Sequence, residues 1–216
     1  DRLAVQLANS IELIDLYLAC VKTGVIFVPV NILYRDREIA HIVGDAEPRA
    51  VLNADNLLRG EGQPDHRPVA HLDGGTPAAI IYTSGTTGLP KPIVHGHGGM
   101  VLAALCLNGL HNDVGPSYEA NSWSERFHWY SSTGWVMWNA QLSGLLSGTT
   151  CVIFDGNPGG SKEHPDWGVL WRFAAETGLT YFGAGAAFFT NCMKAGITLS
   201  DFGDLTRIRA LGTAGT

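Results

Sequence analysis

Short apolar runs alternate along this chain with segments whose apolar residues recur every three or four positions. The runs are bounded by Gly, Pro or polar residues, as buried strands are, and the intervening segments have the period of amphipathic helices. This alternation predicts an α/β fold, a largely parallel sheet flanked by helices. We expect strands at residues 25–30, 49–52, 78–82, 127–131, 149–154, 180–182 and 207–211, and helices at residues 10–23, 36–43, 94–110, 135–146, 166–177 and 186–195.

Local residues predict where the first two helices begin and end. Ser10 is suited to cap the first helix, and Gly24 to end it. Gly44 is expected to stop the second helix.

Three regions are predicted along the chain. Residues 1–55 contain a strand, a helix and a strand, the order of a right-handed parallel crossover (βαβ) unit. Residues 56–77 are rich in Gly, Pro and Asp without periodicity, which predicts a linker. Residues 78–216 form the remaining portion, which carries the chemistry.

A segment rich in hydroxyl and glycine residues directly follows the predicted strand at 78–82. Glycine lets backbone N–H groups converge on one point, hydroxyls add donors, and lysine adds positive charge. Such a cradle suits phosphate oxygens, because a charge-assisted hydrogen bond contributes about 1.5–3 kcal/mol. Pro90 has no N–H and is expected to turn the chain and aim the lysine. The predicted phosphate-binding residues are Thr83, Ser84, Gly85, Thr86, Thr87, Gly88 and Lys91.

This loop differs from the two common nucleotide-binding patterns. Only Thr86 and Thr87 separate its glycines, and Pro90 precedes Lys91, whereas a Walker A loop has four intervening residues and a Gly-Lys-Ser/Thr end. A dinucleotide-binding glycine fingerprint is also absent at this point. The alternative is a flexible Gly/Ser/Thr connection, which the placement directly after a strand disfavours.

Residues 82–91 resemble the phosphate loop of AMP-forming acyl-CoA synthetases and related adenylating enzymes. The similarity covers most of the chain, with residues 56–76 and 108–126 as the exceptions. It implies part of the large N-terminal domain of an adenylate-forming enzyme. Residues 21–31 and 34–38 are similar to the family's N-terminal region, residues 89–99, 132–139 and 154–158 to its acetoacetyl-CoA synthetase branch, and residues 211–216 to the start of its adenine-binding stretch.

The resemblance implies a two-step acid–thiol ligase that uses ATP, Mg²⁺ and coenzyme A. A carboxylic acid would attack the α-phosphate of ATP to give an acyl-adenylate and pyrophosphate, and a thiol would then displace AMP. The phosphate loop would hold the departing pyrophosphate, with Lys91 as the catalytic charge. A short-chain or 3-oxo acid is the expected substrate, although the N-terminal quarter is more similar to the fatty or malonyl type.

Two further groups of residues take their roles from the resemblance. Gly215 and Thr216 match adenine-contacting positions, although many relatives carry Glu where Thr216 stands. The other group matches positions that line the acyl pocket, but Trp135 and Trp138 are one helical turn apart, so core packing is the alternative. This predicted substrate pocket consists of Trp135, Val136, Met137 and Ala214.

The later elements of the resembled family are missing from this sequence. They include an acidic residue that helps to bind magnesium, an aspartate that holds the ribose, and a small C-terminal domain with a catalytic lysine. We therefore expect an N-terminal part that does not turn over alone. The alternatives are a non-catalytic nucleotide-binding fragment and a scaffold domain.

Charge and composition disfavour other classes of protein. The net charge of −6 disfavours nucleic acid as a partner. No apolar stretch approaches the ~18 residues of a membrane span, and no secretory leader is visible. The cysteines are far apart in apolar segments, which predicts buried, reduced thiols and a cytoplasmic protein. They are Cys20, Cys106, Cys151 and Cys192.

The histidines do not predict a metal site. His95 and His97 flank Gly96, but the spacing suggests no third ligand. His128 stands near the position of an aromatic-histidine motif that borders the acyl site in some relatives. It is interpreted either as a pocket residue or as a coincidental match.

Overall fold

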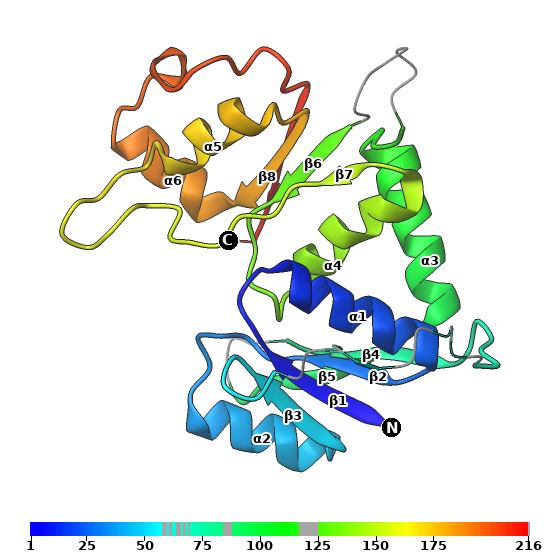
Figure 1. The fold of residues 1–216 in the computed structure, drawn as a ribbon. Coiled ribbons are helices and arrows are strands. Elements are labelled where there is room, and N and C mark those ends of the chain that lie inside the picture. The colour runs from blue at the N-terminus through cyan, green and yellow to red at the C-terminus, as the bar shows by residue number, and fades with distance from the viewer. Residues whose placement is uncertain are drawn as a thin grey trace. The chain divides into compact units, whose positions relative to one another are not determined.

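The computed structural model describes residues 1–57, 60, 62–63, 66, 68, 70–83, 88–116 and 125–215. The chain divides into two compact units. The first comprises Asp1–Ala103 and Ser132–Val136, and the second comprises Ala104–Ser131 and Met137–Thr216. Each unit has its own sheet (Figure 1).

The sheet of the first unit has the strand order β3-β1-β2-β4-β5. Parallel pairs join β1 (Arg2–Gln6) to β2 and β3, and join β2 to β4. The edge strand β5 is antiparallel to β4. The other strands are β2 (Ile26–Pro29), β3 (Ala50–Asn53), β4 (Pro77–Thr83) and β5 (Lys91–Gly96).

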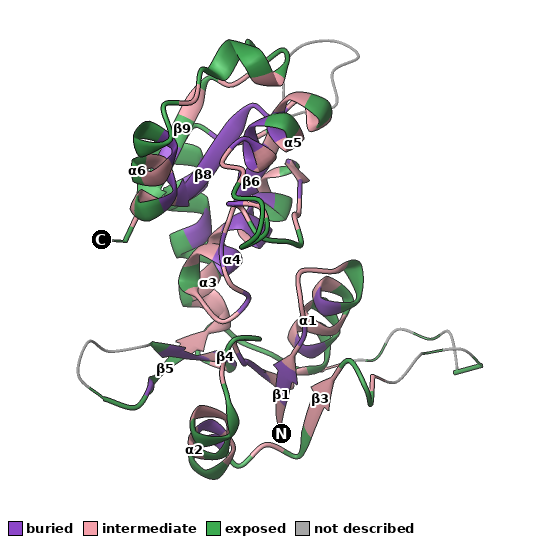
Figure 2. Ribbon diagram, turned by 90° about the vertical axis from the view of Figure 1, so that its left-hand side faces the viewer, coloured by how far each residue is buried: buried purple, intermediate pink, exposed green. Residues whose placement is uncertain are grey.

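Helices α1 (Ile11–Thr23) and α2 (Asp36–Ala46) cover opposite faces of this sheet (Figures 1 and 2). On the α1 face, the rings of Tyr17 and Phe27 meet edge to face with centroids 5.3 Å apart. The α2 face packs a buried aliphatic cluster with one aromatic ring. This cluster consists of Ala4, Val28, Val30, Ile42, Ala46 and Tyr82.

The predicted ends of the first helix are confirmed, and the predicted end of the second is wrong. The Ser10 hydroxyl accepts a hydrogen bond from the N–H of Leu13 at 3.2 Å, and Gly24 ends α1 with φ +72°. Helix α2 continues through Gly44, because one exposed glycine costs only about 1 kcal/mol and the last turn buries Ala46. Glu47 then takes the left-handed position with φ +44°.

The second unit has a four-stranded sheet, β7-β6-β8-β9, in which all pairs are parallel. Its strands are β6 (Arg126–Trp129), β7 (Thr150–Cys151), β8 (Tyr181–Gly185) and β9 (Ala210–Ala214). Helices α4 (Val136–Ser143), α5 (Val169–Thr177) and α6 (Ala186–Lys194) accompany it, with 3-10 turns at Gly144–Ser147 and Leu199–Phe202.

Aromatic rings fill the main core of the second unit. The Trp171 and Phe182 rings meet with centroids 4.9 Å apart, and Phe188 and Phe189 pack beside them. Strand β8 is the most deeply buried element of this unit (Figure 2). Edge-to-face ring pairs of this kind contribute both buried area and defined geometry.

The predicted α/β class with mostly parallel strands is confirmed, but the strands form two sheets rather than one. The predicted helix at 94–110 is wrong at its start, since residues up to Gly96 pair with β4, and cross-strand pairing outweighs the local helical pattern. Helix α3 (His97–Leu105) and a π-helix (Cys106–His111) follow. Strand β1 was not predicted, and β9 begins three residues later than expected.

The cysteine prediction is only partly confirmed. Cys20 and Cys192 are buried free thiols, Cys151 is half-buried, and Cys106 is exposed. The described residues also contain no helix with the length and apolar character needed to cross a bilayer.

Candidate nucleotide-binding site

The predicted phosphate loop connects the two strands of a β-hairpin. Strand β4 ends at Thr83 and β5 begins at Lys91, and these two residues face each other in the antiparallel register. Their Cβ atoms are therefore about 5 Å apart, and both residues are exposed. The side chains of both residues therefore leave the same face of the hairpin at the base of the loop.

The structure places only part of the predicted loop. Thr83, Gly88 and Lys91 are described, whereas Ser84, Gly85, Thr86 and Thr87 lie outside the described residues. The β4 strand that leads into the loop is anchored by buried side chains, including Ile81 and Tyr82. One end of the loop is therefore fixed to the core of the first unit.

A hollow of about 470 Å³ borders the outgoing end of the loop. Its lining consists of residues before and within the first turn of α2, together with Gly88, Leu89 and Pro90. Arg35 and Arg37 give it two exposed guanidinium groups, against the single carboxylate of Glu38. The charge balance of the hollow favours an anionic occupant.

Helix α2 also contacts both ends of the loop. The Nε2 atom of His41 lies 2.8 Å from the carbonyl oxygen of Pro90. The Tyr82 hydroxyl donates to Oδ2 of Asp45 at 2.6 Å. Sequence reasoning missed both contacts, because each joins positions far apart in the chain.

Of the four predicted acyl-pocket residues, Met137 and Ala214 pack against one buried cluster in the second unit. Trp135 and Val136 belong to the first unit, where Trp135 is half-buried and Val136 is 48% exposed. Trp138 is core, with 2% exposure. The cluster that Met137 and Ala214 contact consists of Val114, Phe127, Trp129 and Tyr181.

The Trp129 indole lies across two glycines that sequence reasoning did not single out. Gly183 and Gly212 are register partners on β8 and β9, and a Cβ on either would fall within 2.4 Å of the indole ring. Glycine is required here because the ring approaches the backbone of both strands. The available signal was a glycine directly after each of two predicted strands, although their pairing was unknown.

His128 lies on the other face of β6 from the cluster that holds Met137 and Ala214. Its ring stacks on Phe182, and Nδ1 is 2.7 Å from the carbonyl oxygen of Val152. Burial lowers the pKa of His128 to about 4, more than the hydrogen bond to the Val152 carbonyl raises it. Its surroundings are those of a neutral core residue.

The end of β9 carries the predicted adenine-contacting residues. Gly215 is exposed and has φ +82°, and Thr216 lies outside the described residues. Among the described residues, no group of three His, Cys, Asp or Glu side chains is arranged to hold a metal ion.

The model of the family described as "AMP-binding enzyme" matches residues 1–67 and 53–216 of this chain. The chain belongs to this family. Acetoacetyl-coenzyme A synthetase of Rhizobium meliloti (strain 1021) is 34% identical over 145 residues, 67% of this chain and 21% of the relative. Acetoacetyl-CoA synthetase of Danio rerio is 36% identical over 141 residues, 64% of this chain and 19% of the relative. The chain thus spans about a fifth of the length of these relatives.

Solved structures of AMP-binding enzymes have the same fold. Acetoacetyl-CoA synthetase from Streptomyces lividans matches 100% of this chain and 38% of its own, with 31% identity and a TM-score of 0.83. The N-terminal domain of FACL13 from Mycobacterium tuberculosis covers 100% of this chain and 57% of its own, with 22% identity and a TM-score of 0.81. The second likeness shows the fold alone. The predicted fold, part of the N-terminal domain of an adenylate-forming enzyme, is confirmed.

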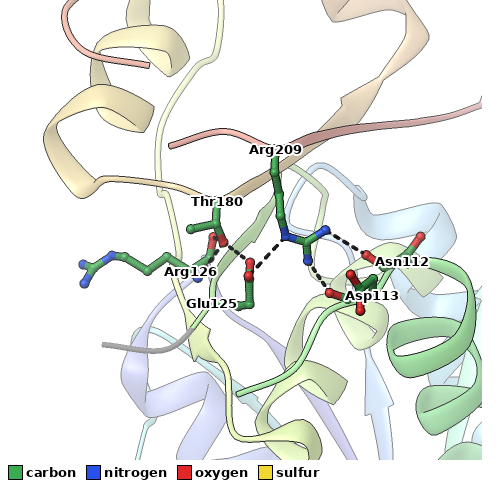
Figure 3. A network of polar contacts seen from close by, with 6 residues as sticks. All are labelled: Asn112, Asp113, Glu125, Arg126, Thr180 and Arg209. Atoms are coloured by element: carbon green, nitrogen blue, oxygen red, sulfur yellow. Dashed lines mark hydrogen bonds and ion pairs between the residues drawn. The ribbon is translucent and has the colours of Figure 1, made fainter. Parts of the chain in front are cut away.

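A polar network in this AMP-binding domain ties together the amino ends of three parallel strands (Figure 3). Glu125, Thr180 and Arg209 immediately precede β6, β8 and β9. Arg209 Nε donates to Glu125 Oε1 at 3.1 Å, and the Thr180 hydroxyl donates to the other carboxylate oxygen. The guanidinium also donates to the carbonyls of Asn112 and Asp113. Ligands of parallel sheets bind at the carboxyl ends, so this network supports the fold at the opposite edge.

Proposed function

We propose that the hairpin loop between Thr83 and Lys91 binds the β- and γ-phosphates of ATP. The single observation that carries this proposal is the pairing of these two exposed residues, since it places a hydroxyl-bearing and an ammonium-bearing side chain on one face at the base of the loop. Fixed donors at this point would stabilise charge as pyrophosphate departs. Lys91 supplies that charge, and Ser84, Gly85, Thr86, Thr87 and Gly88 complete the cradle.

The reaction that this site serves is the activation of a carboxylic acid by ATP, followed by transfer of the acyl group to coenzyme A. The carboxylate attacks the α-phosphate, the bond to pyrophosphate breaks, and the CoA thiol later displaces AMP. The family membership and the relatives named as acetoacetyl-CoA synthetases support an AMP-forming acid–thiol ligase, for which we also propose a cytoplasmic location. The same names favour a 3-oxo or other short-chain acid.

The acid would meet Met137 and Ala214 of the second unit, and adenine would lie near Gly215 and Thr216. Met137 and Ala214 pack against a common cluster, which supports their assignment to one pocket wall. A bound Mg²⁺ would neutralise phosphate charge. The described residues bring no cluster of metal-ligating side chains to the loop.

Calorimetric titration of the chain with ATP tests the phosphate assignment. The double variant Gly85→Val, Lys91→Ala replaces a glycine by a β-branched residue and removes the positive charge of the loop. We expect at least a tenfold loss of affinity, because two or more charge-assisted hydrogen bonds are lost. Lys162→Ala is the control, since it removes one exposed lysine from another loop and should leave the affinity unchanged. A folded double variant that binds ATP as the parent chain does would refute the assignment.

A further inference from the structure

One face of helix α2 holds the phosphate loop at both of its ends. His41 and Asp45 are four residues apart, so they lie on the same side of the helix, one turn from each other. His41 contacts Pro90, just before Lys91, and Asp45 contacts Tyr82, just before Thr83.

The His41 contact fixes the outgoing end of the loop. The Pro90 carbonyl can only accept, so the Nε2 atom of His41 carries the proton in this hydrogen bond. Pro90 is buried, and its ring restricts φ. The residue before Lys91 is therefore held both by its own covalent geometry and by α2.

The Asp45 contact fixes the incoming end. Tyr82 is 3% exposed, and its hydroxyl reaches across to the exposed carboxylate of Asp45. Burial and the neighbouring carboxylate raise the pKa of Tyr82, so its hydroxyl remains a donor. The rings of His41 and Tyr82 also meet edge to face, with centroids 6.3 Å apart.

We propose that His41 and Asp45 are positioning residues that fix the two ends of the phosphate loop, at Pro90 and Tyr82, for phosphate binding. The proposal rests on the function proposed above for that loop. Fixing a backbone around a bound anion costs conformational entropy, which subtracts from the binding free energy. Two contacts from one rigid helix reduce the cost, because the ends of the loop are placed before the ligand arrives.

Helix α2 also packs on the sheet through apolar side chains that make neither polar contact. Its buried side chains, Ile42 and Ala46, belong to the aliphatic cluster beneath the sheet. Ligand affinity and helix stability can therefore be separated by mutation.

Calorimetric titration with inorganic pyrophosphate, read beside thermal unfolding, tests this inference on the full chain. His41→Leu and Tyr82→Phe each remove one contact and should weaken binding about three- to tenfold, the range expected for one hydrogen bond. His41→Gln retains an N–H donor on a side chain of similar length and should restore most of the affinity.

Two controls exclude a merely structural effect. Ile42→Val leaves both contacts in place but creates a small cavity, so it should lower the unfolding temperature without changing pyrophosphate affinity. Asp15→Asn removes an exposed carboxylate from α1 and should change neither.

The outcomes separate this inference from the proposed function. If the parent chain binds pyrophosphate and His41→Leu and Tyr82→Phe bind it equally well, the positioning role is wrong and the phosphate loop stands. Equal weakening by Ile42→Val and His41→Leu would likewise overturn the positioning role. A parent chain that binds neither pyrophosphate nor ATP overturns both proposals.

Discussion

The two units differ in their core packing, although the strand pairs within each sheet are mostly parallel. The first packs mainly aliphatic side chains and ends in an antiparallel hairpin whose loop is held by two polar contacts from α2. The second packs aromatic rings on an all-parallel sheet, and one indole lies directly on two glycines. We therefore expect the aromatic unit to tolerate little change in shape, whereas the ends of the hairpin loop depend on two side-chain contacts.

The largest expected effect tests the tight packing of the second unit. In Gly183→Ala, the new Cβ would lie 2.2 Å from the Trp129 ring. Overpacking usually costs about 1–3 kcal/mol, and this overlap is deep enough for about 4 kcal/mol of unfolding free energy. Denaturant unfolding followed by tryptophan fluorescence measures it.

Gly185→Ala is the matched control on the same strand. Its Cβ would meet only the Ala214 carbonyl oxygen, at an ordinary 3.7 Å. We expect a change below about 0.5 kcal/mol. Equal destabilisation by the two alanines would contradict the role given to the Trp129 contact.

A second effect follows from the buried histidine of the aromatic core. The folded pKa of His128, about 4, is below its ordinary value of 6.5, so the unfolded chain binds the proton first as the pH falls. The contribution of His128 to the free energy of unfolding is complete above pH 6.5. Between pH 6.5 and 4 this contribution falls progressively, by roughly 3 kcal/mol. Unfolding free energies measured across this window give the slope.

His128→Phe should flatten that slope while keeping the ring contacts with Phe173 and Phe182. The Val152 carbonyl retains a donor, because Gln141 Nε2 lies 2.6 Å from it. An unchanged slope in this variant would mean that other groups control the acid sensitivity.

The smallest effect concerns ion pairs in the second unit. In the pair of Arg209 with Glu125, the side chains are 34% and 19% exposed, and both make further hydrogen bonds (Figure 3). Arg209→Ala should cost about 1 kcal/mol. In the pair of Arg172 with Asp166, the side chains are 44% and 43% exposed, and Arg172→Ala should cost about 0.3 kcal/mol. Chemical denaturation of both variants gives the ranking, and the reverse order would contradict it.

Local chemistry made part of this molecule predictable. Ser10 and Gly24 act within one turn of their helix, and the loop could be located because its glycines and hydroxyls follow a buried strand directly. The failures were non-local. Gly44 lies within α2 because burial of Ala46 extends the helix, and Ile93 and Val94 became a strand through pairing with β4.

The same distinction applies to the candidate site. Thr83 and Lys91 were predicted as members of the loop, but their pairing depends on a register that composition does not specify. The contact of His41 with Pro90 joins residues 49 positions apart. The Trp129 contact similarly required the alignment of β6, β8 and β9.

The central claim is that the hairpin loop binds the β- and γ-phosphates of ATP. Amide NMR during a titration with inorganic pyrophosphate tests this claim most directly. We predict saturable shifts concentrated at residues 83–91, while amides of the separate loop at 157–165 remain unchanged. Shifts that are absent at saturating pyrophosphate, or that are centred away from residues 83–91, would contradict the account.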